Sequence, residues 1–207
     1  MRTMDVLDFS TALPFEEYIK IMILLFLQIF AILAVLLYSK VDINQSTPMA
    51  KERYHAIPRT LCFVMNAGKI LLIEYSEKKG PMQGFFNGVG GHVEYGEGII
   101  ENAEREIFEE TGLKPVSTKL KGFFHAVNFF GKNCTVFVTQ SVADTFDVVE
   151  SDEGKLHWID SDKFGSLNMF EDITLILEKI NSLQENEVFT AKAQYDGGGK
   201  LLKFEFE

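Results

Sequence analysis

The chain has 207 residues, of which 46% are hydrophobic, and it carries a formal net charge of −10. This length and apolar content allow one domain of about 150 residues with a real core, together with an appendage. The negative charge argues against sequence-independent binding to nucleic-acid backbones, which needs clustered Lys and Arg, so duplex nucleic acid is not expected as a partner. The two cysteines, Cys62 and Cys134, lack CxxC spacing and are predicted to be small buried thiols.

A strongly apolar segment lies near the N-terminus. Residues 21–37 (IMILLFLQIFAILAVLL) contain Gln28 as their only strongly polar side chain, and as a helix they would span about 25 Å of a bilayer core of about 30 Å. The segment predicts a transmembrane anchor over 18–40 in the lipid bilayer, after an N-terminal tail over 1–17. Two alternatives stay open, a cleaved signal peptide and a buried helix of the soluble domain.

Basic residues are more numerous after the apolar segment than before it. They are Arg2 and Lys20 on the N-terminal side, and Lys40, Lys51, Arg53 and Arg59 on the other. The positive-inside rule therefore predicts a single-pass membrane protein whose C-terminal domain lies on the cytoplasmic side. The polar residues 41–57 are expected to form a linker to a domain over 58–207.

Beyond the linker the apolar pattern is that of an α/β fold. The predicted strands are 59–65, 69–74, 119–128, 135–141, 156–159, 187–195 and 201–207. A helix is predicted over 171–183, from its apolar periodicity. Asn66-Ala67-Gly68 and Asp196-Gly197-Gly198-Gly199 each separate two predicted strands, which indicates a hairpin at each place.

An acidic segment with a defined spacing follows the second predicted strand. On a helix, Glu106, Glu109 and Glu110 would fall within an arc of about 100°, so three carboxylates would share one face. Like charges at these spacings weaken an isolated helix, and a divalent cation with oxygen ligands is the usual way such a cluster becomes favourable. A solvated acidic face is the alternative interpretation.

Apolar residues and glycines flank the three carboxylates. An apolar stripe beside them, predicted to dock the helix on the core, consists of Ile100, Ala103 and Ile107. Gly112 follows as the predicted end of the helix, because glycine accepts the left-handed conformation. Gly90 and Gly91 precede the helix and suit a loop whose backbone approaches a metal ion or a phosphate closely.

From Gly91 to Leu113 the sequence GHVEYGEGIIENAEREIFEETGL has the spacing G-x5-E-x7-R-E-U-x-E-E-x-G-U, where U is aliphatic. This spacing resembles the Nudix box, and an accidental match is expected at fewer than roughly one in 10⁸ positions. The resemblance implies the Nudix fold, an α/β fold in which a mixed β-sheet lies between α-helices, preceded here by the expected transmembrane helix. It also implies a hydrolase of phosphoric anhydride bonds in nucleotides that uses Mg²⁺, with Mn²⁺ as a substitute.

The resemblance also implies which residues form the site. The expected metal ligands are Gly90, Gly91, Glu106, Glu109, Glu110 and Glu153. Glu106 is the first candidate to orient or deprotonate the attacking water, and Glu153 is the alternative. Arg105 would fix the geometry of the glutamates, Glu97 would support the loop, and Gly112 would be structural. Glu150 is the alternate for Glu153, and an exposed acidic loop is the other interpretation of both.

Three segments outside the box resemble MutT-type hydrolases of oxidised purine nucleoside triphosphates. They are KKGPMQGFFN at 78–87, VESDEGKLHW at 149–158 and NMFED at 168–172. In that group Asn87 would contact the purine base, and Glu171 with Asp172 would form a carboxyl pair that shares a proton and reads the base. The alternatives are a turn residue at Asn87 and a helix N-terminus that favours acids at 171–172.

The sequence therefore predicts Mg²⁺-dependent hydrolysis of a nucleoside triphosphate to the monophosphate and pyrophosphate, with 8-oxo-dGTP as the leading substrate. Two alternatives stay open. One is a Nudix pyrophosphatase for ADP-ribose, dinucleotide polyphosphates or nucleotide sugars, because the box indicates the diphosphate chemistry and not the attached group. The other is a membrane-anchored, non-catalytic nucleotide-binding module.

Overall fold

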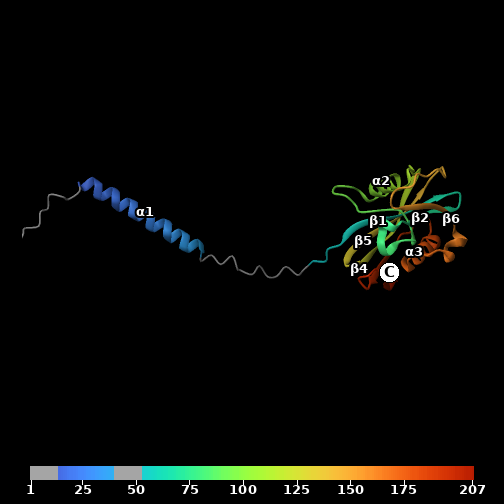
Figure 1. Cartoon of the computed structure of the whole chain (residues 1–207). Helices are drawn as coiled ribbons and strands as arrows, with labels where there is room; N and C mark the ends of the chain where they lie inside the picture. Colours follow the sequence, from blue (N-terminus) through green and yellow to red (C-terminus); the bar gives the residue numbers. More distant parts are fainter. Residues whose placement is uncertain (1–13, 40–52) are drawn as a thin grey trace, which may run out of the picture. The chain divides into compact units, whose positions relative to one another are not determined.

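The computed structural model describes residues 14–39 and 53–207. The chain divides into two compact units, Met1–Arg53 and Tyr54–Glu207, and each is described by itself. Figure 1 shows the first as a single helix and the second as a sheet with helices on it. The linker predicted over 41–57 lies mostly outside the described residues, so the domain limits of 1–17, 18–40, 41–57 and 58–207 stay predictions.

The first unit contains helix α1, Phe15–Ser39. Glu16 and Glu17 lie in its first turn, and Lys20 Nζ pairs with the Glu17 carboxylate at 2.8 Å. Within the described residues, no helix is long and apolar enough to cross a membrane. The described residues therefore do not support the transmembrane anchor predicted over 18–40 or the bilayer as a partner. The cytoplasmic orientation is untested and stays a prediction.

The second unit is built on one mixed sheet of eight strands. Its strand order is β3-β2-β1-β5-β4-β7-β8, and β6 also pairs with β2. The strands are β1 Ile57–Asn66, β2 Lys69–Tyr75, β3 Phe86–Asn87, β4 Ser117–Phe129, β5 Lys132–Val142, β6 Gly154–Asp160, β7 Phe189–Tyr195 and β8 Leu201–Phe206. Strand β1 runs parallel to β5, and β4 runs parallel to β7, while the other pairs are antiparallel. The prediction of a mixed sheet is confirmed.

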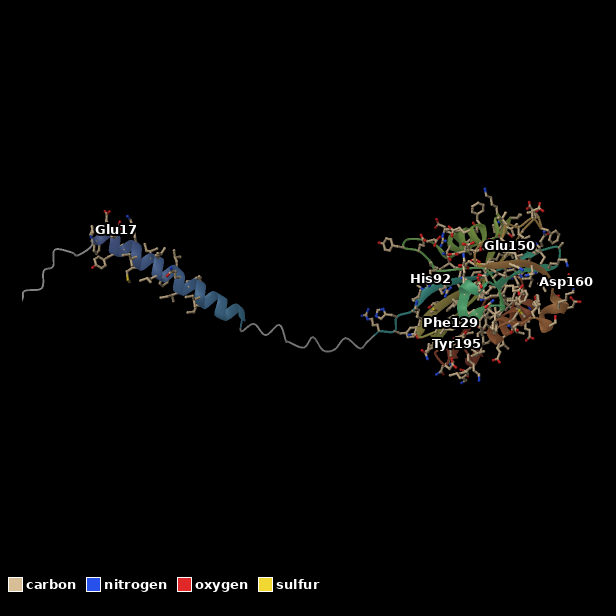
Figure 2. All side chains as sticks on the ribbon, viewed as in Figure 1. Glu17, His92, Phe129, Glu150, Asp160 and Tyr195 are labelled. Carbon is tan, nitrogen blue, oxygen red and sulfur yellow. The ribbon has the colours of Figure 1, made fainter. Side chains whose placement is uncertain are left out.

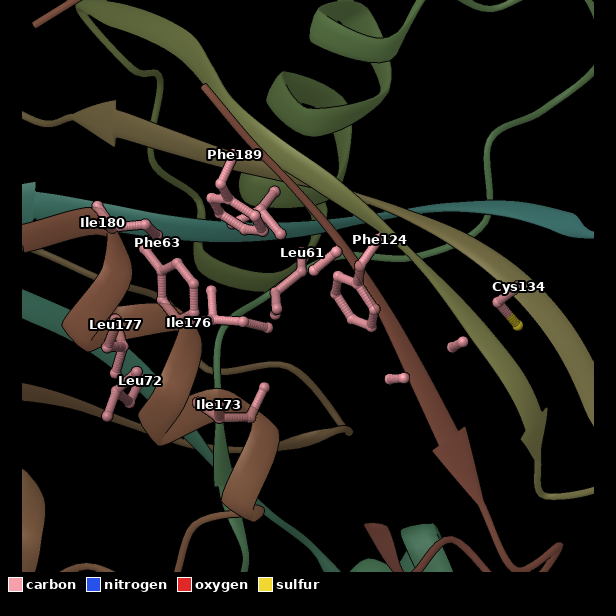
Figure 3. Packing of buried hydrophobic residues seen from close by; sticks show 14 of the residues in the cluster. Leu61, Phe63, Leu72, Phe124, Cys134, Ile173, Ile176, Leu177, Ile180 and Phe189 are labelled. Atoms are coloured by element: carbon pink, nitrogen blue, oxygen red, sulfur yellow. The ribbon is translucent and has the colours of Figure 1, made fainter. Parts of the chain in front are cut away.

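Two α-helices and two short 3₁₀ helices complete this unit. They are α2 Ile99–Thr111, α3 Glu171–Ser182, η2 Glu77–Met82 and η3 Ser161–Ser166. The core has two parts, because α3 packs with one set of strand residues and α2 with another. Figure 3 shows the first part, where Ile173, Ile176 and Ile180 of α3 face the sheet. The sheet therefore lies between helices, as predicted.

Strand β1 contributes to both parts of the core. Leu61 and Phe63 pack in the part that contains α3, whereas Cys62 and Val64 pack in the part that contains α2. Successive side chains of a strand point to opposite faces, so this alternation follows directly from the pleat. Cys62 is buried and free, as is Cys134, which confirms the prediction of small buried thiols.

Both predicted hairpins are present. Strands β1 and β2 pair from Asn66 to Lys69 around a turn in which Ala67 and Gly68 have positive φ. Strands β7 and β8 form the terminal hairpin. The sequence did not predict the two-residue strand β3 or the 3₁₀ helices, because such short elements carry no measurable periodicity.

Helix α2 is held on the sheet by Ile107, whose side chain is 0% exposed, whereas Ile100 on the same helix is 37% exposed. Ile107→Ala should lower the free energy of unfolding by about 2–5 kcal/mol, because it removes buried methyl groups and leaves a cavity. Ile100→Ala is the matched control and should cost less than about 1 kcal/mol. Urea unfolding of the purified proteins measures both, and equal losses would contradict the placement of Ile107 in the core.

Candidate active site

The boundaries of α2 fix where its carboxylates lie. Before the helix, the Gly98 N–H donates to Glu101 Oε2 at 3.2 Å, which caps the first turn. At the other end Gly112 has φ 73° and its N–H donates to the Phe108 carbonyl at 2.8 Å. This is the left-handed end predicted from the sequence. Of the predicted apolar stripe, Ala103 and Ile107 are fully buried and Ile100 is not.

Arg105 forms ion pairs with three carboxylates of the loop and of α2. Its Nε donates to Glu97 Oε1 at 2.7 Å, and its Nη1 donates to Glu109 Oε2 at 2.9 Å and lies 3.0 Å from Glu106 Oε1. One guanidinium can serve several oxygens because its donors are arranged in a planar fork. Arg105 thus contacts Glu106 and Glu109, two of the glutamates whose geometry it was predicted to fix, and it also pairs with Glu97. The effect of both residues on catalysis stays a prediction.

Glu97 is held by two donors from α2. The Arg105 hydrogen bond lowers the pKa of Glu97 to about 2, against the opposing effect of burial, and Asn102 Nδ2 also donates to Glu97 Oε2 at 2.7 Å. Asn102 is completely buried and accepts a 2.6 Å hydrogen bond from the Thr60 hydroxyl. The sequence analysis missed Asn102, which fastens the loop and the helix to β1.

Glu110 is the most buried of the three glutamates on the helix face. Only 6% of the surface of Glu110 is exposed, and its Oε1 accepts a hydrogen bond from the Gly90 N–H at 3.2 Å. Burial, then repulsion from Glu153 and Glu106, raises the pKa of Glu110 to about 8. Burial also raises the pKa of Glu106, whereas the Glu109 carboxylate is more than half exposed. The three side chains share a face of α2 but differ in burial, so a nearby positive charge would stabilise the anionic form of Glu110 and Glu106 more than that of Glu109.

The paired glycines leave room for these carboxylates. A Cβ built on Gly91 would overlap the Glu106 carboxylate, and one built on Gly90 would overlap the Thr60 carbonyl. Gly90 also has φ 142°, in the region that favours glycine. The loop backbone therefore approaches a carboxylate of α2 and a carbonyl of β1 closely, while the predicted approach to a metal ion or a phosphate stays a prediction.

Of the two acidic candidates near 150, Glu153 is the one that lies by the helix glutamates. Its charge contributes to the raised pKa of both Glu106 and Glu110. Lys79 Nζ pairs with Glu153 Oε1 at 2.7 Å. Glu150 instead accepts a long hydrogen bond from the Leu156 N–H at 3.4 Å. This placement favours Glu153 over its alternate.

A divalent cation fits the donor set around α2. Its ligands would be carboxylate oxygens, which Mg²⁺ prefers. Glu110 is buried with a raised pKa, and the Gly91 backbone packs directly against the Glu106 carboxylate. In the part of the chain that the structure describes, no three His, Cys, Asp or Glu side chains are already gathered at metal-binding distances. The Arg105 guanidinium here pairs with Glu106 and Glu109.

A cavity adjoins this carboxylate cluster. The predicted substrate residues Asn87 and Asp172 both line it, as do Gly90 and Lys79. Asn87 Nδ2 donates to the Tyr75 hydroxyl at 3.0 Å, and its Oδ1 accepts the Gly88 N–H at 2.8 Å. The asparagine side chain is therefore fixed by its neighbours and has one amide hydrogen left for a ligand.

The predicted carboxyl pair is divided between two cavities. Asp172 is buried and lines both, whereas Glu171 is exposed and lines only the second, which also contains Phe85, Met169 and Phe170. Phe85 and Phe170 stack with their ring centroids 4.4 Å apart. The structure thus brings Asp172 to Asn87 and leaves Glu171 outside their cavity, because consecutive residues at the start of α3 point in different directions.

Sequence reasoning missed Tyr75, Lys79 and Tyr195, all of which line the first cavity. Lys79 Nζ lies 5.3 Å from the centroid of the Tyr75 ring. Lys79 stands inside the KKGPMQGFFN segment, and a basic residue so close to the glycine loop was a usable signal. The sequence around Tyr195 does not indicate a binding role, because the residue fits the pattern of an ordinary strand end.

Comparisons with known proteins identify the family of this chain. The family model described as NUDIX domain matches residues 56–180, which is more than half of the chain. The chain therefore belongs to the Nudix family, whose members are hydrolases that act on pyrophosphate bonds of nucleotides. Nudix enzymes generally use a divalent metal ion such as Mg²⁺.

Two relatives and one solved structure show where the similarity lies. The chain is 36% identical over 115 residues to the oxidized purine nucleoside triphosphate hydrolase of Danio rerio, covering 55% of this chain and 72% of that protein. It is 33% identical over 118 residues to the Nudix hydrolase YvcI of Bacillus subtilis, covering 53% and 70%. The crystal structure of the MutT protein from Bacillus halodurans superposes with a TM-score of 0.63 at 27% identity, covering 73% of this chain and 97% of that one.

The depressed pKa of Glu97 predicts how stability changes with acid. Because its folded pKa of about 2 lies below the ordinary 4.5, its contribution is complete above pH 4.5 and is lost as the pH falls toward 2. Glu97→Gln should therefore be less stable than wild type at pH 6, and the difference should shrink between pH 4.5 and 3. Urea unfolding across this range measures it.

Arg105→Met is the companion variant for this test. It removes the main cause of the depressed pKa, so in its background the Glu97→Gln substitution should produce little pH-dependent change. A wild-type advantage over Glu97→Gln that stays constant from pH 6 to 3 would contradict the pairing.

Proposed function

We propose that this protein hydrolyses a nucleoside triphosphate to the monophosphate and pyrophosphate in the presence of Mg²⁺, with an oxidised purine such as 8-oxo-dGTP as substrate. The observation that carries the proposal is the position of Gly90. This residue lines the cavity that contains Asn87 and Asp172, and its N–H donates to Glu110 in the carboxylate cluster. A nucleotide whose base enters the cavity would have its phosphates beside the glutamates.

The charges at this junction support binding of phosphates. Lys79 and Arg59 line the same cavity, so two cationic side chains accompany the glycine loop. Lys79 pairs with Glu153 at 2.7 Å in this structure. A triphosphate would give both cations an additional anionic partner, because phosphate oxygens are strong hydrogen-bond acceptors.

The carboxylates around α2 would hold the metal ion and handle the proton. Glu106, Glu109 and Glu110, with Glu153 and the Gly90 or Gly91 carbonyl, are the residues proposed to hold Mg²⁺. When bound, the ion supplies neutralisation of phosphate charge and a more acidic water. Glu106 is the first candidate to take the proton from that water, since burial raises its pKa toward the range of an effective base. Glu153 is the alternative.

Two findings support an oxidised purine as the base. Asn87 and Asp172, taken from the resemblance to MutT-type enzymes, line one cavity although 85 positions separate them in the chain. The Danio rerio relative, 36% identical, is named an oxidized purine nucleoside triphosphate hydrolase. Both findings favour a purine nucleoside triphosphate over ADP-ribose, a dinucleotide polyphosphate or a nucleotide sugar as the substrate.

Substrate profiling tests this proposal. With Mg²⁺, the purified protein should convert 8-oxo-dGTP to the monophosphate and pyrophosphate with a higher kcat/KM than it hydrolyses dGTP, 2-hydroxy-dATP, ADP-ribose or diadenosine polyphosphates, each scored by its own nucleotide products. A preference for ADP-ribose or a dinucleotide would keep the carboxylate cluster and reject the base assignment. Inactivity on every compound would favour the non-catalytic binding module.

A second prediction concerns Glu106. Glu106→Gln should lower kcat by about 10²–10⁴, because it removes a carboxylate proposed both to hold the ion and to accept the proton. Glu104→Gln is the control, since Glu104 is an exposed residue of the same helix. Initial rates of pyrophosphate release measure both. An unchanged rate in Glu106→Gln would remove α2 from the catalytic assignment.

A further inference from the structure

Tyr195 completes the wall of the cavity from outside the matched family segment. It is the last residue of β7, whereas the family model ends at residue 180. Its side chain is almost fully buried, with 3% of the residue exposed, and it lines the cavity together with Asn87 and Asp172. An element that follows the matched segment therefore contributes to the proposed base site.

The sheet itself fixes the position of the Tyr195 ring. Strand β7 pairs in parallel with β4, and the ring packs edge-on against Phe129 of β4 with 4.9 Å between centroids. Figure 2 labels both residues. Asn128 Nδ2 also donates to the Tyr195 carbonyl at 3.3 Å. Because the ring is held by backbone pairing and by an aromatic neighbour, its hydroxyl has a defined direction.

The Tyr195 hydroxyl forms a hydrogen bond with Asp172. The Tyr195 O–H donates to Asp172 Oδ2 at 2.6 Å, and the Ile173 N–H donates to Asp172 Oδ1 at 3.0 Å. An O–H···O distance of 2.6 Å is in the range of charge-assisted bonds. Burial raises the pKa of Asp172, and the bond from Tyr195 opposes that rise. Each oxygen of the carboxylate keeps a further lone pair with which it can accept a hydrogen bond from a ligand.

Two adjacent acceptors match two adjacent donors. A guanine-type ring presents its ring N–H and its exocyclic amine side by side on one edge. An adenine-type ring presents an acceptor nitrogen at the corresponding place, which would face a carboxylate lone pair without a proton between them. A site whose buried polar groups are left unpaired by the wrong ligand rejects that ligand strongly.

We propose that Tyr195 is a positioning residue for base recognition, whose hydroxyl holds Asp172 as a paired acceptor and so directs the cavity toward guanine-type rings. This inference rests on the proposed function and deepens it. The 8-oxo group lies on the opposite part of the purine, so Tyr195 selects the class of ring and not its oxidation state.

The test compares Tyr195→Phe, which keeps the ring and removes the hydroxyl, with wild type. Steady-state kinetics with Mg²⁺ on dGTP, dITP and dATP are paired with calorimetric binding of dGMP, dIMP and dAMP. Inosine keeps the ring N–H and lacks the amine, so it reports one of the two donors. Tyr54→Phe is the control, because Tyr54 is half-exposed and lies outside the cavity.

Tyr195→Phe should weaken dGMP binding and raise the KM for dGTP about tenfold, with a smaller effect on the inosine compounds and the smallest on the adenine compounds. The loss should fall on KM rather than on kcat. Asp172→Asn, which replaces one acceptor by a donor, should reduce the same guanine preference even if Tyr195→Phe were to unfold. Tyr54→Phe should match wild type.

Equal losses for guanine and adenine compounds, or no loss for either, would overturn the inference. So would a wild-type protein that binds dGMP no better than dAMP. The binding measurements need no turnover, which separates this inference from the proposed function. Suppose that wild type hydrolyses none of the triphosphates but binds dGMP more tightly than Tyr195→Phe does. That result would reject the proposed hydrolysis and retain the proposed role of Tyr195.

Discussion

The close packing of the glycine loop against helix α2 is the constraint on which the candidate site depends. A side chain at Gly91 would overlap the Glu106 carboxylate, and the Gly90 N–H donates to the Glu110 carboxylate. Asn102 holds the two segments at this distance, since it bonds both to β1 and to the loop. The carboxylates can gather beside the cavity only because the backbone there carries no side chains.

The buried carboxylates of this cluster lower the local stability of the fold, and the same carboxylates are the ones proposed to bind the metal ion. A buried carboxylate with a pKa near 8 is unfavourable as an anion, and nearby Glu106 and Glu153 make it more so. Arg105 offsets part of the repulsion on the exposed side of the helix, where it pairs with Glu97, Glu106 and Glu109. The fold thus tolerates an electrostatic strain that a bound cation would relieve, which is common where charge performs chemistry.

The sequence predicted those features that depend on residues close together in the chain. The spacing of Glu106, Glu109 and Glu110 fixed their common helix face, Gly112 marked the helix end, and both hairpins followed from their turn residues. What local pattern could not reveal depends on strand order. Tyr195 reaches Asp172 only because β7 pairs with β4, and Glu171 is separated from Asp172 only by the direction in which α3 starts. The apolar run near the N-terminus was interpreted from composition alone, and the described part of α1 does not meet the requirement for a span.

The alternation along β1 also limits which changes of length the protein can accept. Odd-numbered Leu61 and Phe63 belong to the part of the core with α3, and even-numbered Cys62 and Val64 belong to the part with α2. Inserting or deleting one residue within Ile57–Asn66 would exchange the two sets, so the cavity and the carboxylate helix would lose their support together. Related chains that differ in length should therefore carry their insertions in loops, while β1 keeps a constant number of residues between its two ends.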